Sequence, residues 1–301
     1  MIYSASEPFC DWLSVTYAPD SPVIDDIQMW LHSAGGSCSR SDDKSSLWNL
    51  GLASDRSGTV RLDFKRGYSG VSASGGALAH LRALGLYMDY LSELSLHPHN
   101  ISRIDVSLDV AQDGASVIDS LRSRFSDGVC SLGRKSLPVT YQLNVRPSDG
   151  RETGTFYAGH RSKARTTAAV YDKANEARMV RGEHIPPTTR YEMRMRSEKG
   201  RAGASLRDAA EPERLFWHIA SPTLLKAPDN VPAWSSGWGG GWSYTRPNKP
   251  LPAEVLASRV EFSPEIDSLI VLADTIGSSG RRYLMRKLEE KILGRLSSDS
   301  L

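Results

Sequence analysis

Hydrophobic and polar positions change period several times between residues 10 and 220 of the chain. Alternation with a period of two predicts strands, whereas apolar residues three and four apart predict helices. The predicted strands are 10–17, 45–53, 58–67, 102–112, 138–145, 153–159, 165–171 and 189–198. The predicted helices are 23–34, 76–94, 115–127, 172–181 and 205–220. These elements predict an α+β fold, a largely antiparallel sheet with flanking helices.

The texture of the chain changes after residue 220. Segment 221–252 is rich in Pro, Gly, Ser and Trp, which predicts an irregular excursion or linker. Helical periodicity returns in 253–301, so we expect a small helical C-terminal part after one large domain over 1–220. The aromatic residues of the excursion either stack on unpaired bases or anchor the segment to the core; they are Trp234, Trp238, Trp242 and Tyr244.

Composition narrows the class of protein. The chain has 301 residues, 40% hydrophobic and 24% charged, as expected for a globular protein with a sizeable core. It contains no run of about 20 apolar residues and no secretory signal, so we expect no membrane span. Cys10, Cys38 and Cys130 are widely spaced and odd in number, which favours a reduced cytoplasmic protein over a disulfide framework.

Charge is unevenly distributed, although the net charge is only +2. The segment from Ala158 to Arg207 contains 12 Lys and Arg against 5 Asp and Glu, a local excess of +7. Such a segment suggests an anionic partner, most often a nucleic-acid backbone. A solvated, arginine-rich surface is the alternative.

The stretch RIDVSLDV alternates acids with apolar residues. Asp105 and Asp109 share one strand face with Arg103 and Ser107. Carboxylates four residues apart lie roughly 13 Å apart along a strand, so both bind one ion directly only if the strand bends. One acid is therefore a ligand while the other supports it or pairs with an arginine, unless both are ordinary surface charges.

The stretch TRYEMRMRSE repeats this design, with Glu192 on the same face as three arginines. Arginine forks match phosphate oxygens, although Asp105 and Asp109 could instead neutralise these arginines. If the two strands adjoin in one sheet, Asp105 or Asp109 converges with Glu192. Hard oxygen ligands of this kind suit Mg²⁺ or Mn²⁺.

Tyr171 lies where the apolar run TTAAV meets the charged run DKANEAR. Tyrosine is a poor nucleophile near neutral pH, because its hydroxyl titrates near pH ~10. Lys173 lies on the same side as Tyr171 if the strand persists, and could lower the pKa of the phenol or bind phosphate. Tyr171 could attack phosphorus if the carboxylate face is assembled beside it.

Four segments in this order resemble the replication initiation factor family, the Rep_trans-type initiators of rolling-circle plasmids and filamentous bacteriophages. They are DWLSVTY, RIDVSLD, TFYAGHRSKARTTAAVYDKANEAR and TRYEMRMRSE. The resemblance runs from residue 11 to about residue 200 and does not cover 222–301. It departs from the family at Ala169, where many members have an aromatic or basic residue, and in the Trp/Gly-rich excursion.

The resemblance implies a metal-dependent DNA strand transferase of the bacterial cytoplasm. Such a protein nicks one strand at an origin, stays linked to the 5′ phosphate through tyrosine, and later religates the strand. Its partners would be single-stranded or origin DNA, with host helicase and polymerase as further partners. The implied nicking and DNA-binding domain is 1–220.

The same resemblance implies roles for individual residues. Tyr171 would be the nucleophile, with Tyr157 as the alternative, and Lys173 and Arg190 would assist. The implied ligands of Mg²⁺ or Mn²⁺ are Asp105, Asp109 and Glu192. The residues expected to contact DNA are Arg161, Lys163, Arg165, Arg194 and Arg196.

Three other readings stay open at this point. Water rather than tyrosine could attack phosphorus, which would make the protein a hydrolytic metal-dependent nuclease. Alternatively, the acids merely balance arginines in a non-catalytic DNA-binding regulator. The triplet His97-Pro98-His99 imitates a paired-histidine metal motif, but its proline and the following Asn100 favour a turn.

Overall fold

The computed structural model describes residues 7–19, 21–42, 44–50, 58–65, 67–132, 135–160, 164–198 and 203–234. Within these residues, eleven strands form one sheet in the order β2-β3-β4-β5-β1-β6-β11-β10-β9-β8-β7. All neighbouring strands run antiparallel. The predicted α+β class with a largely antiparallel sheet is therefore confirmed.

The strands are β1 Phe9–Tyr17, β2 Ser37–Ser41, β3 Ser45–Asn49, β4 Thr59–Lys65, β5 Tyr68–Ser74, β6 His99–Val110, β7 Val129–Leu132, β8 Lys135–Val145, β9 Glu152–Ala158, β10 Thr166–Asp172 and β11 Thr189–Arg196. The helices are α1 Val23–Ser33, α2 Gly75–Ala83, α3 Tyr87–Ser95, α4 Gly114–Arg124, α5 Lys173–Arg181, α6 Leu206–Ala210 and α7 Pro212–Ala220.

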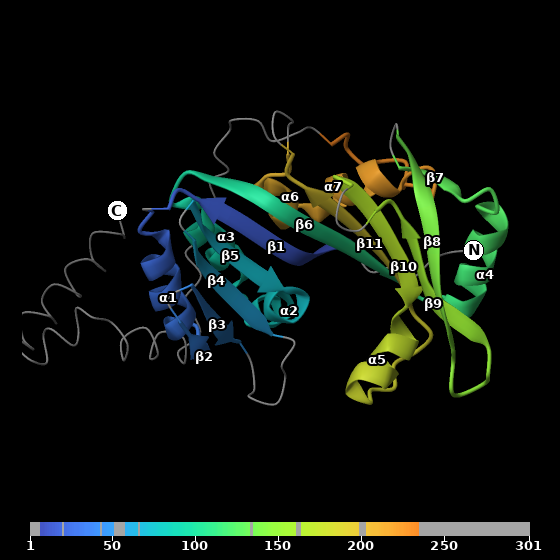
Figure 1. The fold of residues 1–301 in the computed structure, drawn as a ribbon, viewed down its shortest axis with the longest axis horizontal. Coiled ribbons are helices and arrows are strands. Elements are labelled where there is room, and N and C mark those ends of the chain that lie inside the picture. The colour runs from blue at the N-terminus through green and yellow to red at the C-terminus, as the bar shows by residue number, and fades with distance from the viewer. Residues whose placement is uncertain are drawn as a thin grey trace, which may run out of the picture.

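One face of the sheet carries the hydrophobic core. On central strand β6, Ile104, Val106 and Leu108 are at most 2% exposed. Helices α2, α6 and α7 pack against the central strands, α1 and α3 pack beside them, and α4 packs on β9 and β10 (Figure 1). The apolar positions of the central strands β1, β6 and β11 recur every second residue, so they face these helices.

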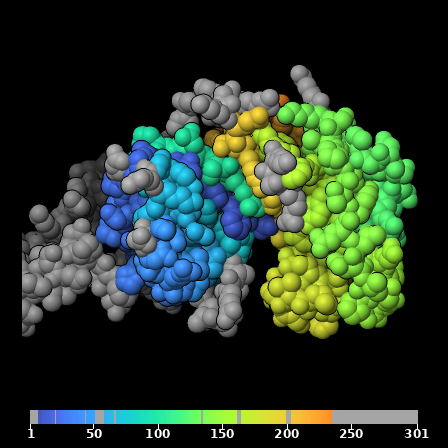
Figure 2. Space-filling view, viewed as in Figure 1, coloured from blue at the N-terminus to red at the C-terminus, as the bar shows by residue number. Residues whose placement is uncertain are grey.

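The opposite face carries polar side chains. Figure 2 shows the molecule hollowed between the blue half, which holds β2–β5, and the green and yellow half, which holds β8–β10 and α5. Helix α5 extends from the end of β10 at the border of this hollow (Figure 1). The polar face of β1, β6, β11 and β10 is the place where the residues selected from the sequence come together.

The predicted helix over 76–94 is wrong, because two helices occupy this segment. Helix α2 ends at Ala83, and Gly85 then adopts a left-handed φ of +71° before α3 begins at Tyr87. Glycine reaches this conformation without the clash that a Cβ would cause, so it ends the first helix despite continuous helical periodicity.

Three strands and one strand boundary were not predicted. Strands β2, β5 and β7 are short and rich in serine, glycine or cysteine, so they show little alternation of apolar and polar residues. Strand β6 begins at His99, so the predicted turn over 97–100 is correct only for its first half. His97 Nε2 lies 2.9 Å from Asp26 Oδ2, and the His99 ring binds the carbonyl of His97.

The predicted helices of 253–301 and most of segment 221–252 lie outside the described residues. Trp234, at the end of the described part, anchors to the core: its Nε1 donates to Asp208 Oδ1 over 2.7 Å. Its ring centroid lies 4.6 Å from that of His218. Trp238, Trp242 and Tyr244 lie outside the described residues. None of the helices described in the structure has both the length and the hydropathy needed to cross a bilayer.

Gly114 offers a test of how tightly α4 is seated on β10. A Cβ at Gly114 would overlap the Cα and Cβ of Asp172, the last residue of β10. We expect Gly114→Ala to lower the free energy of unfolding by about 1–3 kcal/mol, because the backbones cannot separate without shifting α4. Urea denaturation measures this loss. Gly203→Ala, where a Cβ meets nothing within 4 Å, is the control, and an equal effect at both positions would contradict the close seating.

Candidate active site

A β-bulge in β1 places an acid on the polar face that the sequence-based site did not include. Cys10 pairs with Val106 and Trp12 pairs with Asp105, so Asp11 is an extra residue between two regular pairs. A bulge of this kind re-aims one side chain without disturbing its neighbours. Asp11 Oδ2 accepts from Arg190 Nη1 at 3.1 Å and from Ser107 Oγ at 3.4 Å.

Strands β6 and β11 adjoin, as the site hypothesis required. Arg190 is paired in register with Asp109, Glu192 with Ser107, and Arg194 with Asp105. Because residues directly opposite each other point to the same side, both predicted polar rows share one face.

Arg190 links the acids at one end of this face. Its Nε and Nη2 donate to the two oxygens of Asp109 over 2.6 and 2.7 Å, a two-pronged ion pair, while Nη1 donates to Asp11. Its guanidinium also lies 5.1 Å from the ring centroid of Phe9. The Arg190 side chain is 12% exposed. Burial acts to lower its pKa, but the hydrogen bond to Asp109 and the charges of Asp11, Tyr171 and Asp109 together raise the pKa above its ordinary value. Arg190 is therefore a fixed cation.

Arg194 links the acids in the middle of the face. Its Nε and Nη2 donate to the two oxygens of Asp105 over 3.0 Å each, and Nη2 also donates to Glu192 Oε1 over 3.0 Å. Asp105 is 2% exposed and accepts further hydrogen bonds from Arg103. The ion pairs therefore agree with the alternative reading of these acids: Asp109 neutralises Arg190, and Asp105 neutralises Arg194.

The surroundings of Glu192 disfavour the charged form of its carboxyl group. Burial, and then the nearby charges of Asp105 and Asp11, raise its pKa to about 7, and the guanidinium of Arg194 only partly offsets this. Near neutral pH, Glu192 therefore exchanges a proton readily, which is a property of general acids and bases.

This shift predicts how stability depends on pH. The pKa of Glu192 rises from 4.5 to about 7 on folding, so its contribution is fully present below pH 4.5 and is lost as pH rises through 7. In wild type, the free energy of unfolding should therefore fall by about 3 kcal/mol between these limits, and we expect this fall to be absent in Glu192→Gln. Urea unfolding in EDTA across this range measures the difference from wild type. Glu211→Gln, at an exposed ion pair, is the control, and parallel pH profiles for wild type and Glu192→Gln would contradict the shift.

Tyr171 belongs to the same face. It is paired in register with Arg190, and Ala169, two residues earlier, is paired with both Glu192 and Tyr157. Tyr171 lines a cavity of about 260 Å³ together with Tyr157, Glu192 and Arg194. The structure therefore brings both candidate tyrosines to the carboxylates.

The phenol of Tyr171 is not activated by its surroundings as they stand. Burial raises its pKa above the ordinary value, Glu192 and Asp11 raise it further, and Arg190 opposes them. Attack by this oxygen therefore requires a base that takes its proton, or a cation that lowers its pKa.

The predicted role of Lys173 is corrected by the end of β10. The strand stops at Asp172 and Lys173 opens α5, so Lys173 does not continue the strand face of Tyr171. Its Nζ lies 6.0 Å from the Tyr171 ring centroid but donates to Glu176 Oε2 over 2.6 Å. Glu176 therefore neutralises the charge that was expected to lower the pKa of the phenol.

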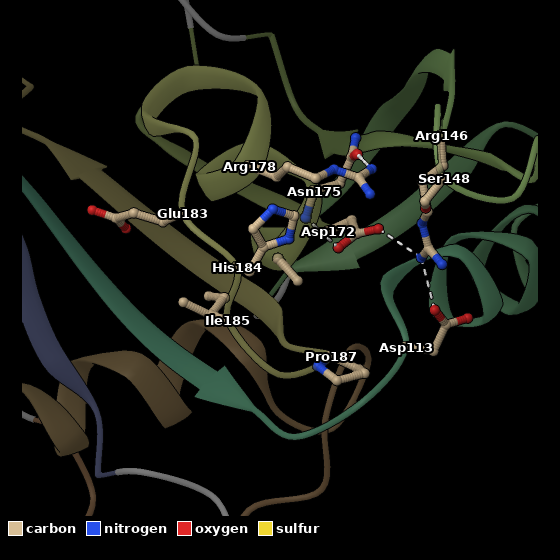
Figure 3. A pocket seen from close by; sticks show the side chains of 11 residues that line it. Asp113, Arg146, Ser148, Asp172, Asn175, Arg178, Glu183, His184, Ile185 and Pro187 are labelled. Carbon is tan, nitrogen blue, oxygen red and sulfur yellow. Dashed lines mark hydrogen bonds and ion pairs between the residues drawn. The ribbon is translucent and has the colours of Figure 1, made fainter.

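A second ion-pair cluster fixes the end of β10. Asp172 caps α5 by accepting from the backbone N–H of Asn175 over 3.0 Å. Arg146 Nη2 joins Asp172 to Asp113, which caps α4, over 2.7 Å each (Figure 3). Thr153 Oγ1 also donates to Asp172 over 3.1 Å. Tyr171 precedes this anchored residue, so its backbone position is set by α4, β8 and β9 together.

The five residues expected to contact DNA divide into three groups. Arg161 and Lys163 lie outside the described residues. Arg194 is half-buried and donates to Asp105 and Glu192, so it is not a free surface cation. Arg165 and Arg196 are joined through the backbone at the far end of β10 and β11, where the Arg196 N–H donates to the Arg165 carbonyl over 2.8 Å.

The residues present fit a divalent cation only in part. Within the described ranges, no group of three His, Cys, Asp or Glu side chains is arranged to hold a metal ion. Asp105 and Glu192 form a contacting pair whose mutual repulsion a cation would relieve, and Asp11 lies near them. Both oxygens of Asp105 and both oxygens of Asp109 already accept from guanidinium groups, and Asp105 differs from Asp109 in contacting Glu192.

Comparisons with known proteins show a similarity between this chain and a solved structure. No protein-family model and no curated protein matches the chain. Among solved structures, the chain is similar to one titled "Structure of Rolling Circle Replication Initiator Protein from Geobacillus stearothermophilus". The two share 15% sequence identity and a TM-score of 0.49, over 86% of this chain and 97% of that chain. A likeness at this level assigns neither a function nor a site residue to this chain.

Proposed function

We propose that the protein is a rolling-circle replication initiator that nicks one DNA strand through a transient 5′-phosphotyrosine link and later religates it. The observation that carries this proposal is the convergence of Tyr171, Arg190, Asp11, Asp105 and Glu192 on one polar face of the sheet. A nucleophile, fixed cations and acids on one open face are the parts that phosphoryl transfer requires.

The proposed step conserves the number of phosphodiester bonds. The Tyr171 oxygen bonds to phosphorus while the bond to the 3′ oxygen breaks. The leaving 3′ oxygen takes up one proton, which balances the proton released by the phenol, and becomes a hydroxyl. Glu192, with a pKa of about 7, is the group we assign to accept the phenol proton. Arg190 supplies a fixed positive charge beside the phenol for the developing charge on phosphate. Attack by the 3′ hydroxyl on the phosphotyrosine reverses the step and closes the strand.

Asp105 and Glu192, with Asp11 beside them, are the residues that would hold Mg²⁺ or Mn²⁺. When bound, such an ion supplies positive charge that favours the ionised phenol and neutralises phosphate. Asp109 is assigned instead to holding Arg190, to which both its oxygens bond, whereas Asp105 is kept as a ligand because it contacts Glu192.

Metal binding by these acids is expected to raise stability in the absence of DNA. At a Mn²⁺ concentration about 100-fold above Kd, the free energy of unfolding should rise by about 3 kcal/mol. Thermal denaturation with Mn²⁺ or EDTA measures the change. The gain should disappear in Glu192→Gln and persist in Asp109→Asn; the reverse order would restore Asp109 as a ligand.

A non-catalytic DNA-binding regulator is the second candidate. The complete ion pairing of Asp105 and Asp109 with arginines favours it, as does the raised pKa of Tyr171. A hydrolytic nuclease, in which water attacks phosphorus, would use the same acids without the tyrosine.

One assay separates the three candidates. The full chain is incubated with origin single strands and Mg²⁺ or Mn²⁺, and the products are resolved on a denaturing gel. A protein–DNA adduct supports the initiator, cleavage without an adduct supports the nuclease, and DNA binding without either supports the regulator. Origin DNA, host helicase and host polymerase in the bacterial cytoplasm are the partners that the proposed function requires.

A further inference from the structure

The polar face of the sheet contains a second and larger cavity away from Tyr171. It measures about 820 Å³ and lies where the end of β1 meets the starts of β5 and β6. Arg103 lines it and lies six residues before Asp109 on β6, roughly 20 Å along a strand. We call this cavity the β1–β5 groove.

The floor of the β1–β5 groove is lined by small hydroxyl side chains. Ser72 Oγ donates to Ser14 Oγ over 2.9 Å, and Ser102 Oγ donates to the carbonyl of Ser14 over 3.1 Å. Gly70, in register with Thr16, leaves the floor without a side chain at its centre. Such a floor offers hydrogen-bonding groups to a polar ligand.

The rim of the groove pairs aromatic rings with cations. Tyr68 is 37% exposed, and Lys65 Nζ lies 2.8 Å from its hydroxyl and 5.1 Å from its ring centroid. On the side toward the carboxylates, the guanidinium of Arg103 lies 4.5 Å from the Trp12 ring centroid. Asp63, the one acid among the described residues that line the groove, is paired with Arg61 over 3.0 Å.

Exposed aromatic rings, cations beside them and a hydroxyl floor on an open β-sheet match the chemistry of unpaired nucleotides. Bases stack on aromatic rings, lysine and arginine hold phosphates, and hydroxyls bond to base edges. A duplex hides the faces of its bases, so an exposed tyrosine adds little to duplex binding.

We propose that the β1–β5 groove binds a single-stranded segment of DNA, with Tyr68 as a stacking platform and Lys65 as a phosphate contact. The polar row of β6 joins the groove to the acids near Tyr171, so one strand can occupy both places. This proposal rests on the proposed function for the identity of the strand, and it adds a site that the catalytic residues do not include.

The test compares single-stranded and double-stranded probes with the full chain. Fluorescence anisotropy gives Kd for an oligothymidylate of roughly 20 nucleotides and for a duplex of equal length, since single-strand sites span roughly 4–16 nucleotides. Tyr68→Ala should raise Kd for the single strand about 10-fold and change Kd for the duplex less than about 2-fold. Tyr68→Phe, which keeps the ring, should retain single-strand affinity. Lys135→Ala, an exposed lysine at the other edge of the sheet, is the control.

Each outcome decides for or against the groove. An unchanged single-strand Kd in Tyr68→Ala, or an equal loss for both probes, overturns the proposal, and the second result would assign the groove to duplex DNA. Adduct formation by the wild-type chain is measured in parallel, which separates the two hypotheses. Loss of single-strand affinity in a protein that forms no adduct would support the groove while rejecting the proposed function. An adduct together with insensitivity to Tyr68 would do the reverse.

Discussion

Replacing Tyr171 with phenylalanine is expected to abolish the protein–DNA adduct and to slow strand cleavage by about 10³-fold or more. The substitution removes only the phenol oxygen, so the ring keeps its place in the cavity and beside Lys173. The adduct requires a bond between phosphorus and a tyrosine oxygen, and this variant lacks the oxygen to which we assign that bond. Single-turnover cleavage of origin DNA, followed on denaturing gels, measures the loss.

Tyr157 is the matched control for this experiment. It projects from the neighbouring strand onto the same face and lines the same cavity, so it shares the surroundings of Tyr171. Tyr157→Phe should leave adduct formation within about 3-fold of wild type, whereas loss of a true nucleophile is far larger. An adduct that survives Tyr171→Phe but not Tyr157→Phe would transfer the nucleophile to Tyr157. Unchanged DNA affinity in both variants would show that the folded surface is intact.

Replacing Asp105 with alanine is expected to lower the free energy of unfolding by about 3–5 kcal/mol in EDTA. Asp105 is nearly inaccessible to solvent and accepts from Arg103 and Arg194, so its removal leaves two guanidinium groups without their carboxylate. A buried charge that loses its partner is far more costly than an exposed one. Urea denaturation at neutral pH gives the difference.

Asp63→Ala provides the comparison for Asp105. Asp63 lies on the same face, but its partner Arg61 has a side chain that is 56% exposed, so its loss should cost at most about 1 kcal/mol. If Asp105→Ala left stability unchanged or raised it, the ion pairs would not hold the sheet together. Asp105 would then act mainly as a cation ligand, since removing one of several crowded acids relieves repulsion when no metal is present.

Sequence periodicity was sufficient for the central strands. The alternation in RIDVSLDV and TRYEMRMRSE correctly assigned Leu108 and Met193 to the core and Glu192 to the polar face, because a strand has a strict period of two. Periodicity failed at Gly85, where one left-handed residue divides a continuous apolar pattern into two helices.

The partners of the charged side chains were beyond the reach of the sequence. Pairing register decides that Arg190 meets Asp109 and Arg194 meets Asp105, and register depends on which strands adjoin. For the same reason, the sequence analysis did not include Asp11 in the site, although the sequence does contain a signal for a bulge at this residue. Cys10, Leu13 and Val15 are buried, so the doublet Asp11-Trp12 between them interrupts the alternation, as expected of a bulge.

The bulge makes Asp11 a supernumerary residue of the sheet. Cys10 and Trp12 already occupy successive rungs opposite Val106 and Asp105, so shortening the chain by this one residue would leave every other side chain of β1 on its present side. Loss of a residue from the regular part of the strand, Leu13–Tyr17, would reverse the sidedness of β1 on one side of the gap. At this position, an acid can be gained or lost on the polar face of the sheet while the apolar side chains of β1 stay in the core.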